Sequence, residues 1–107
     1  MAKLERMLEV DFDQLLKHVE DGIVRGSVSA SLEGGSDFSQ GTARCSVRVF
    51  ERYSYAGGNR VSLSVTLFQN GGPVCVSAVA SGGSQASFEQ LNTWGERAFL
   101  EKLEKLL

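Results

Sequence analysis

GTARCSVRVFERYSYAGGNRVSLSVTLFQNGGPVCVSAVASGGSQASFEQLN, residues 41–92, is the stretch that decides the fold of this chain. It consists of runs in which apolar and polar residues alternate, separated by glycine-rich segments. Successive side chains of a strand point to opposite sides of a sheet, so the alternation predicts half-buried antiparallel strands joined by turns. The run 60–69 carries large aliphatic side chains on one face: Val61, Leu63, Val65 and Leu67. This run is the predicted centre of the sheet.

The two neighbouring runs show the same two-residue period. Their residues expected on the core face are Cys45, Val47, Val49, Tyr53, Tyr55, Val74, Val76, Ala78 and Ala80. The register has to bring apolar faces together, because a slip of one residue turns every side chain to the other side. At 70–73, where Asn-Gly favours a hairpin turn, an even loop would pair Leu67 with Val74. At 56–59 an odd loop of three or five residues would pair Val61 with Tyr55.

Residues 85–91 have two interpretations. An odd loop at 82–84 makes them a further strand, with Ala86 and Phe88 on the core face. Alternatively, one long helix begins at Ser87, with Gln90 as its capping partner. We favour the strand, because Asn92 would be costly inside a long helix.

The last element is predicted to be a helix from Trp94 to about Leu106. Thr93 and Glu96 have the spacing of a capping box, in which each residue satisfies a free backbone N–H group at the helix start. Apolar residues then recur at helical spacing along one face. They are Phe99, Leu103 and Leu106.

The N-terminal residues 3–9 fit either a strand or a helix. Asp11 can cap a helix, and Gln14 stands at the capping-box position. A helix that begins there needs non-helical chain before it, so we predict an edge strand at 3–9. The helix should extend from Phe12 to about Asp21, with Gly22 as its stop.

Residues 24–33 alternate again and are predicted to form a strand. The following segment, 34–42, is rich in glycine and polar residues, so we expect a loop whose one large apolar residue is Phe38. Two helices can cover only one face of the resulting sheet. The prediction is a single α+β domain over 1–107, with two layers and a mainly antiparallel meander of five or six strands.

Composition limits the possible functions. The formal net charge is −2 and the isoelectric point is about 5.4, so no overall positive charge attracts nucleic acid or anionic lipid. The N-terminus has no apolar signal segment, and no run approaches bilayer length. Cys45 and Cys75 are expected on opposite faces and make a poor disulfide pair. We therefore expect a cytoplasmic protein.

No group of residues indicates a reaction. The one histidine, His18, is expected on the surface of the first helix, and with two separated cysteines it is too little for a metal site. The glycines at 82–83 could cradle a phosphate only if a helix followed directly. We expect a protein that is not an enzyme and has no cofactor.

Two features of the run 43–53 have competing explanations. Arg44, Arg48 and Arg52 share a face with interleaved aromatic residues, as in some single-strand binders, but we favour a solvated face whose arginine stems cover the sheet. Nucleic acid is therefore not the expected partner. Glu51 is predicted on the core face, where a carboxylate is costly unless paired. A β-bulge or a position at the end of the sheet would explain it.

Two segments resemble a known family. They are RVFERYSY, residues 48–55, and SGGSQ, residues 81–85, continuing to NTWGE, residues 92–96. They are similar to a family of small bacterial proteins classed as a domain of unknown function, and the resemblance implies no activity or catalytic residue. The order of elements also looks like a reduced helix-grip domain, a fold in which many members bind apolar ligands. That likeness concerns the fold alone.

The favoured function is self-association as a homodimer. The sheet face opposite the helices should be lightly charged and should hold Phe50 near Phe68. The candidate interface residues are Arg48, Phe50, Arg52, Thr66, Phe68 and Val79. The alternative is a carrier of a small apolar ligand, with a pocket between the last helix and the sheet. Its candidate lining residues are Tyr53, Tyr55, Phe88 and Trp94.

Overall fold

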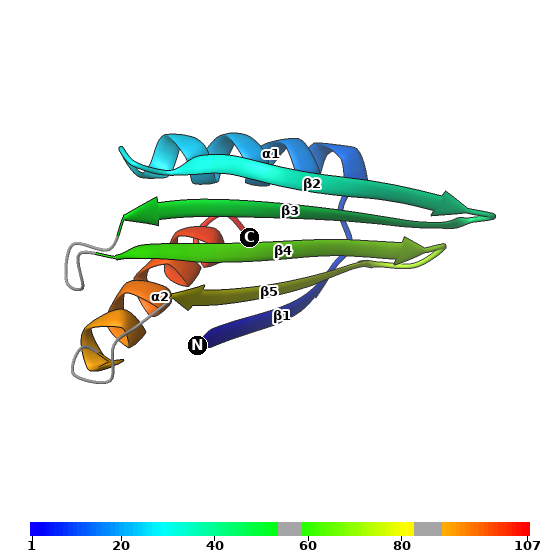
Figure 1. Cartoon of the computed structure of the whole chain (residues 1–107). Coiled ribbons are helices and arrows are strands. Elements are labelled where there is room, and N and C mark those ends of the chain that lie inside the picture. Colours follow the sequence, from blue (N-terminus) through cyan, green and yellow to red (C-terminus); the bar gives the residue numbers. More distant parts are fainter. Residues whose placement is uncertain (54–58, 83–88) are drawn as a thin grey trace.

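The computed structural model of the chain describes residues 1–53, 59–82 and 89–107, with the side chains of 89–94 left out. Five antiparallel strands form one sheet, and two helices lie on one of its faces (Figure 1). The strand order is β1-β5-β4-β3-β2. The elements are β1 (Ala2–Leu8), α1 (Phe12–Gly26), β2 (Ser31–Gln40), β3 (Ala43–Tyr53), β4 (Arg60–Asn70), β5 (Val74–Gly82) and α2 (Glu89–Glu104). The predicted two-layer α+β fold is confirmed.

The hydrophobic core lies between the sheet and the helices. Its largest contribution comes from alternate residues of β4 and β5, as predicted. These residues are Val61, Leu63, Val65, Leu67, Val74, Val76, Ala78 and Ala80. The helices add Phe12, Leu15, Val19 and Ile23 from α1, and Phe99 and Leu103 from α2. No helix in the described part of the chain is long and apolar enough to span a bilayer.

The predicted facing of β3 is wrong. Phe50 lies opposite Leu63 and Arg52 lies opposite Val61, and the six residues 54–59 connect the two strands. The connection is therefore even, and it turns the opposite face of β3 towards the helices. Phe50 is fully buried as a result. The residues predicted to face the core, Cys45, Val47, Val49 and Tyr53, lie on the other side, and Tyr55 is outside the described residues.

The hairpin between β4 and β5 has the predicted parity. Leu67 lies opposite Val76, two residues beyond the predicted partner Val74, so the apolar faces still match. Gly71 in the turn has a φ of +73°. This left-handed conformation costs a glycine far less than a residue with a Cβ atom.

Helix α1 begins as predicted and ends later. The Asp11 carboxylate accepts a hydrogen bond from the Gln14 amide at 2.9 Å, which confirms the N-cap. The helix continues past Gly22 to Gly26. A Cβ atom on Gly22 would lie 2.6 Å from both Leu106 methyl groups, so this glycine serves helix packing instead of ending the helix.

The longer helix shifts the element that follows it. The strand predicted at 24–33 begins only at Ser31, and most of the predicted loop 34–42 is strand β2. An irregularity in the β2–β3 register lies between Leu32 and Gly34, and Gly41 begins the turn with a φ of +59°. The polar, glycine-rich composition of this segment reflects an exposed edge strand.

The N-terminal segment forms an edge strand of the sheet, whereas residues 89–91 belong to a helix. The predicted edge strand at 3–9 is confirmed, because β1 pairs with β5. That pairing leaves no free side of β5 for a further strand, and residues 89–91 are helical, so the predicted strand at 85–91 is wrong there. Thr93 lies within α2 and not at its start. The predicted core residues Ala86 and Phe88 are outside the described residues.

Candidate interaction surface

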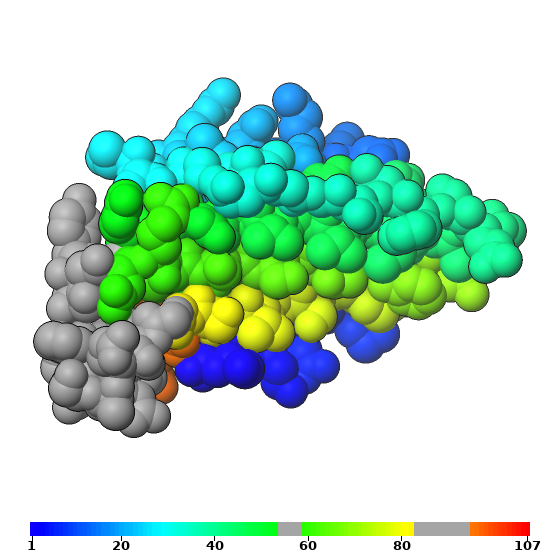
Figure 2. All heavy atoms as spheres, viewed as in Figure 1, coloured from blue at the N-terminus to red at the C-terminus, as the bar shows by residue number. Residues whose placement is uncertain are grey.

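The sheet has one face that no described element covers. We call it the open face. Figure 2 views the molecule from this side, and the strands lie in front of the helices. The registers of all four strand pairs place five non-polar side chains in one line across the sheet. This line, the central row, consists of Phe38, Cys45, Phe68, Cys75 and Met7.

The central row is accessible to a partner. Phe38 and Met7 at its two ends are each 68% exposed, and Phe68 at its centre is 43% exposed. Next to it, Val49 and Val79 stand on either side of Ser64, and all three are half-buried. Small and non-polar side chains therefore occupy the middle of the open face. A shallow hollow of about 390 Å³ beside Phe68 is part of the same surface.

Charged residues on this face stand at its periphery and are paired within the chain. Lys3 and Glu5 on β1 lie 3.5 Å apart. At the far end, the Arg60 guanidinium lies 2.8 Å from the Glu51 carboxylate and 3.8 Å from that of Glu33. The predicted core position of Glu51 is thus wrong, because β3 faces the other way. Its carboxylate is on the open face and has a cation as partner.

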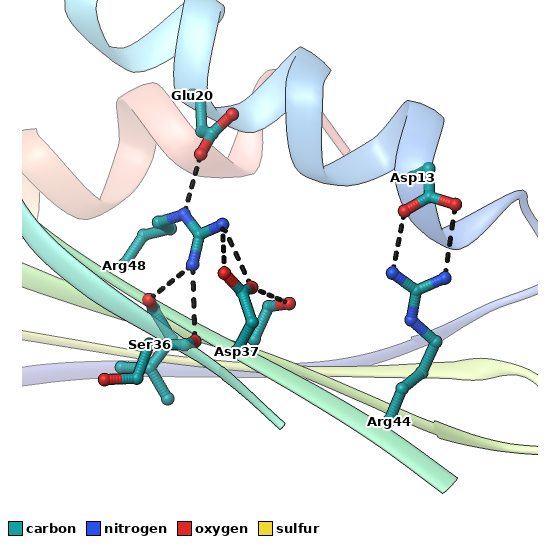
Figure 3. A network of polar contacts seen from close by, with 8 residues as sticks. Asp13, Glu20, Ser36, Asp37, Arg44 and Arg48 are labelled. Atoms are coloured by element: carbon teal, nitrogen blue, oxygen red, sulfur yellow. Dashed lines mark hydrogen bonds and ion pairs between the residues drawn. The ribbon is translucent and has the colours of Figure 1, made fainter. Parts of the chain in front are cut away.

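Arg44 and Arg48 of β3 point to the covered face, towards α1 (Figure 3), and Arg52 shares that face. Arg44 donates two hydrogen bonds to Asp13 of α1, at 2.7 and 3.2 Å, and its guanidinium lies 3.9 Å from the centre of the Phe12 ring. Arg52 donates to the Ser27 hydroxyl at 2.6 Å and lies over the Phe99 ring at 4.7 Å. The interpretation of a solvated arginine face is therefore wrong, although the stems do cover the sheet. These arginines hold α1 against β3.

Arg48 is the centre of this network, and only 13% of its side chain is exposed. Its Nε–H group donates to Glu20 of α1 at 2.7 Å, and its guanidinium lies 3.0 Å from the Asp37 carboxylate of β2. The remaining donors reach the backbone carbonyls of Ser36 and Val47. One side chain thus joins a helix to two strands. A planar guanidinium has the several fixed donors that this arrangement requires.

The network shifts the pKa of its members. Hydrogen bonds from the Ser46 hydroxyl and from Arg48 lower the pKa of Asp37. Arg44 lowers the pKa of Asp13 in the same way, by hydrogen bonding and by its charge. Hydrogen bonds to Glu20 and Asp37 raise the pKa of Arg48 above its ordinary value. All three shifts favour the charged forms, as expected for ion pairs that stabilise the folded state.

The six candidate interface residues do not share one face. Thr66, Phe68 and Val79 lie on the open face. Arg48, Phe50 and Arg52 lie on the covered face, and Phe50 does not approach Phe68 as predicted. The central row contains Cys45, which was predicted to face the core, and Phe38, which was predicted to lie in a loop. The hydrophobic alternation of β3 offered no signal for this, because both of its faces carry large side chains.

Cys45 and Cys75 share the open face, contrary to the prediction of opposite faces. Both are free, and each lies directly opposite Phe68. They are two strand spacings apart, about 10 Å, which exceeds the roughly 7 Å between Cα atoms that a disulfide tolerates. The conclusion that they form no internal disulfide holds for a different geometric reason.

The candidate ligand pocket is not assembled by the described residues. Tyr53 is 54% exposed, and the Arg60 guanidinium lies 5.0 Å from the centre of its ring, on the open-face side. Tyr55 and Phe88 are outside the described residues, as is the side chain of Trp94. Between α2 and the sheet, the described space is filled by Phe99 and Leu103, both fully buried.

His18 is exposed, as predicted. Its Nε2 atom lies 3.0 Å from the Leu106 carbonyl oxygen, across the contact between the two helices. Within residues 1–53, 59–82 and 89–107, no group of three or more histidine, cysteine or acidic residues could hold a metal ion. The polar side chains that the structure brings together serve packing, and among the described residues the open face is the most distinctive surface.

Fold and surface together define a small α+β domain with one covered and one open sheet face. The chain belongs to the family of unknown function DUF6054, whose model matches residues 1–107. No curated protein and no solved structure matches the chain. The resemblance predicted from residues 48–55 and 81–96 is therefore confirmed as far as membership of a family of unknown function.

Proposed function

We propose that this chain is a non-enzymatic assembly domain that forms a homodimer through its open face. The occupant of the face is a second copy of the same chain. The observation that carries the proposal is the central row, in which Phe38, Phe68 and Met7 remain exposed across the full width of the sheet. Apolar side chains in a contiguous line, bordered by polar residues, are typical of an interface.

The size of the open face suits a small dimer. Five strands about 4.8 Å apart and a paired length of about seven residues give a face of roughly 20 by 24 Å. This flat area of roughly 480 Å² is close to the roughly 500 Å² per partner that a specific interface should reach, so the dimer would be at the small end of the range. Two such faces would pack as an aligned sandwich, which is the usual arrangement for antiparallel sheets.

The charges favour a second copy over a charged partner. Lys3 is paired with Glu5, and Arg60 is paired with Glu51, so the rim of the face is nearly neutral. A second copy would therefore meet no block of like charge. The arginines that could have attracted nucleic acid point to the covered face, where Arg44 and Arg48 pair with acidic residues and Arg52 donates to the Ser27 hydroxyl. Two free cysteines suit a reducing setting, and we propose a cytoplasmic one.

The test replaces Phe68 with aspartate. A buried, unpaired carboxylate at the centre of an interface is costly, so Phe68→Asp should give a folded monomer where the wild type is a dimer. Sedimentation equilibrium over a range of concentrations measures the mass, and circular dichroism checks folding. The matched control is Val28→Asp. It makes the same kind of change at a fully exposed residue beyond the end of α1, and it should remain a dimer.

A wild type that sediments as a monomer at high concentration would refute the proposal. So would a Phe68→Asp variant that stays dimeric, because the contact would then lie elsewhere on the molecule.

A further inference from the structure

The open face has similar side chains at equivalent positions on the two sides of β4. Strand β4 runs down its middle, with β3 and β2 on one side and β5 and β1 on the other. On the central row, Cys45 and Cys75 lie at equal positions on the two sides of Phe68. Phe38 and Met7 occupy the two outer positions of the same row. The row therefore has a similar kind of side chain at each pair of equivalent places.

The match continues along the sheet. On the row that contains Ser64, the neighbours are Val49 on β3 and Val79 on β5. The outer positions of that row are Gly34 on β2 and Lys3 on β1. Glu33 precedes Gly34 at the register irregularity. At the level of this row, one edge of the open face thus carries the cation Lys3 and the other edge carries the anion Glu33.

From this pattern we infer that the homodimer has its twofold axis parallel to β4, so that β3 of one copy lies over β5 of the other. This inference rests on the proposed function. The axis brings Phe68 onto Phe68 of the second copy, Cys45 onto Cys75, and Val49 onto Val79. Phe38 then meets Met7, a favourable contact between an aromatic ring and a thioether. Lys3 meets the edge that carries Glu33.

The other face-to-face twofold axis, across the strands, fits less well. If this axis passed through the central row, Val49 and Val79 would face the hairpin turns of the second copy and not its sheet. Centred on the next row, it would place Glu5 on Glu5 of the second copy, and like charges at an interface are unfavourable. The axis along β4 covers both apolar rows and opposes no like charges. Aligned sheets cross at about 30°, so the match is closest near the axis, at the cysteines and Phe68.

The cysteines make a direct test possible. Cys45→Ser and Cys75→Ser each leave one thiol per chain, and a short bismaleimide joins two thiols that face each other. If β3 lies over β5, an equimolar mixture of the two variants should yield covalent dimer, with a mass of two chains plus one linker. Each variant alone should yield only background, because each copy then lacks the thiol that its partner requires. Sedimentation of both variants checks that they still associate.

The outcomes separate this inference from the proposed function. Strong cross-linking of either variant alone would show an axis across the strands, which overturns the inference and leaves the homodimer standing. No cross-linking in the mixture or in either variant alone, with a dimeric wild type, would show that no thiol faces a partner thiol, which overturns the inference. The Phe68→Asp variant then decides separately whether the contact still lies on the open face. A monomeric wild type would refute the proposed function itself.

A charge exchange gives an independent readout if serine at the cysteines weakens association. Lys3→Glu and Glu33→Lys should each raise the dimer dissociation constant by roughly two- to fivefold, the range for an exposed ion pair. The double variant should return it towards the wild-type value. An axis across the strands predicts no such recovery, so its absence would overturn the inference.

Discussion

The two faces of the sheet come from the same strands, but the helices cover only one of them. On the covered face Phe50 is fully buried beneath the helices, whereas on the open face Phe68 is 43% exposed. Both residues lie in runs that alternate in the same way. Alternation in the sequence therefore predicts which residues share one side of a strand. It does not predict which side the helices will cover.

Strand β3 makes the difference clearest. Its covered face carries Arg44, Arg48 and Arg52, and its open face carries Val47 and Val49. If valine is assumed to be buried and arginine exposed, the predicted core face of β3 is the wrong one. Arginine can occupy a covered edge because its stem is apolar and its guanidinium finds fixed acceptors, here on α1.

The largest expected contrast is between the two phenylalanines. Phe50→Ala should lower the free energy of unfolding by about 3–5 kcal/mol, because it leaves a cavity in the core. Phe68→Ala, the matched change on the open face, should cost less than about 1 kcal/mol in the monomer. Urea titrations at low chain concentration measure both. Equal losses would show that the open face is covered in the folded chain.

Two neighbouring glycines of β2 give the second contrast. A Cβ atom on Gly35 would lie 2.5 Å from the Val47 carbonyl oxygen and 2.7 Å from Cδ of Arg48, whereas one on Gly34 would meet nothing within 4 Å. Gly35→Ala should therefore cost roughly 1–3 kcal/mol, and Gly34→Ala should stay within about 0.5 kcal/mol. Thermal unfolding of the two variants compares them. A tolerated Gly35→Ala would mean that Arg48 does not pack against this strand.

The smallest expected effect is a pH dependence of the ion pairs on the covered face. The folded state lowers the pKa of Asp37 and Asp13, so the unfolded chain takes up protons at these groups first as the pH falls. Their stabilising contribution is present above a pH of about 4 and is lost as the pH falls through their folded pKa. Melting temperatures between pH 2 and 6 should therefore differ less between wild type and Asp37→Asn at the acidic end.

An NMR titration isolates the cause of this pH dependence. The Ser46 hydroxyl is the first contributor to the lowered pKa of Asp37, with the hydrogen bond from Arg48 next. Ser46→Ala should therefore move the Asp37 titration midpoint upwards, towards the ordinary value of an aspartate. An unchanged midpoint would contradict the described geometry of the network.

Much of the fold could be predicted because it depends on near neighbours in the chain. The alternation in 60–69 and 74–80 located the core face of β4 and β5, and Asp11 marked the start of α1 through a contact three residues away. The misplaced elements have a common cause. Gly22 fits a helix stop by local rules, but Leu106, far along the chain, packs against it. Residues 34–40 lack a strand pattern, and they form one because β3 supplies the hydrogen-bond partners.

The sequence predicted that one face of the sheet would be exposed, but it did not predict all of the residues on that face. A sheet with helices on one side must expose its other face, and Phe68, Thr66 and Val79 were placed there. Cys75 also followed from the alternation in 74–80, whereas Cys45, Phe38 and Met7 joined them only through the registers of the strand pairs. Each register depends on an inter-strand contact, and an error of one residue in one connection exchanges the two faces.

The sequence by itself determined that this chain forms a two-layer α+β domain around β4, because the spacing of apolar residues sets which side chains can be buried together. Only the tertiary structure decided which face of β3 is covered. That choice depends on Glu20 and Asp13, which stand 28 and 31 residues before their arginine partners. Ion pairs over such separations leave no periodic signal in the sequence, since they depend on how α1 packs on the sheet.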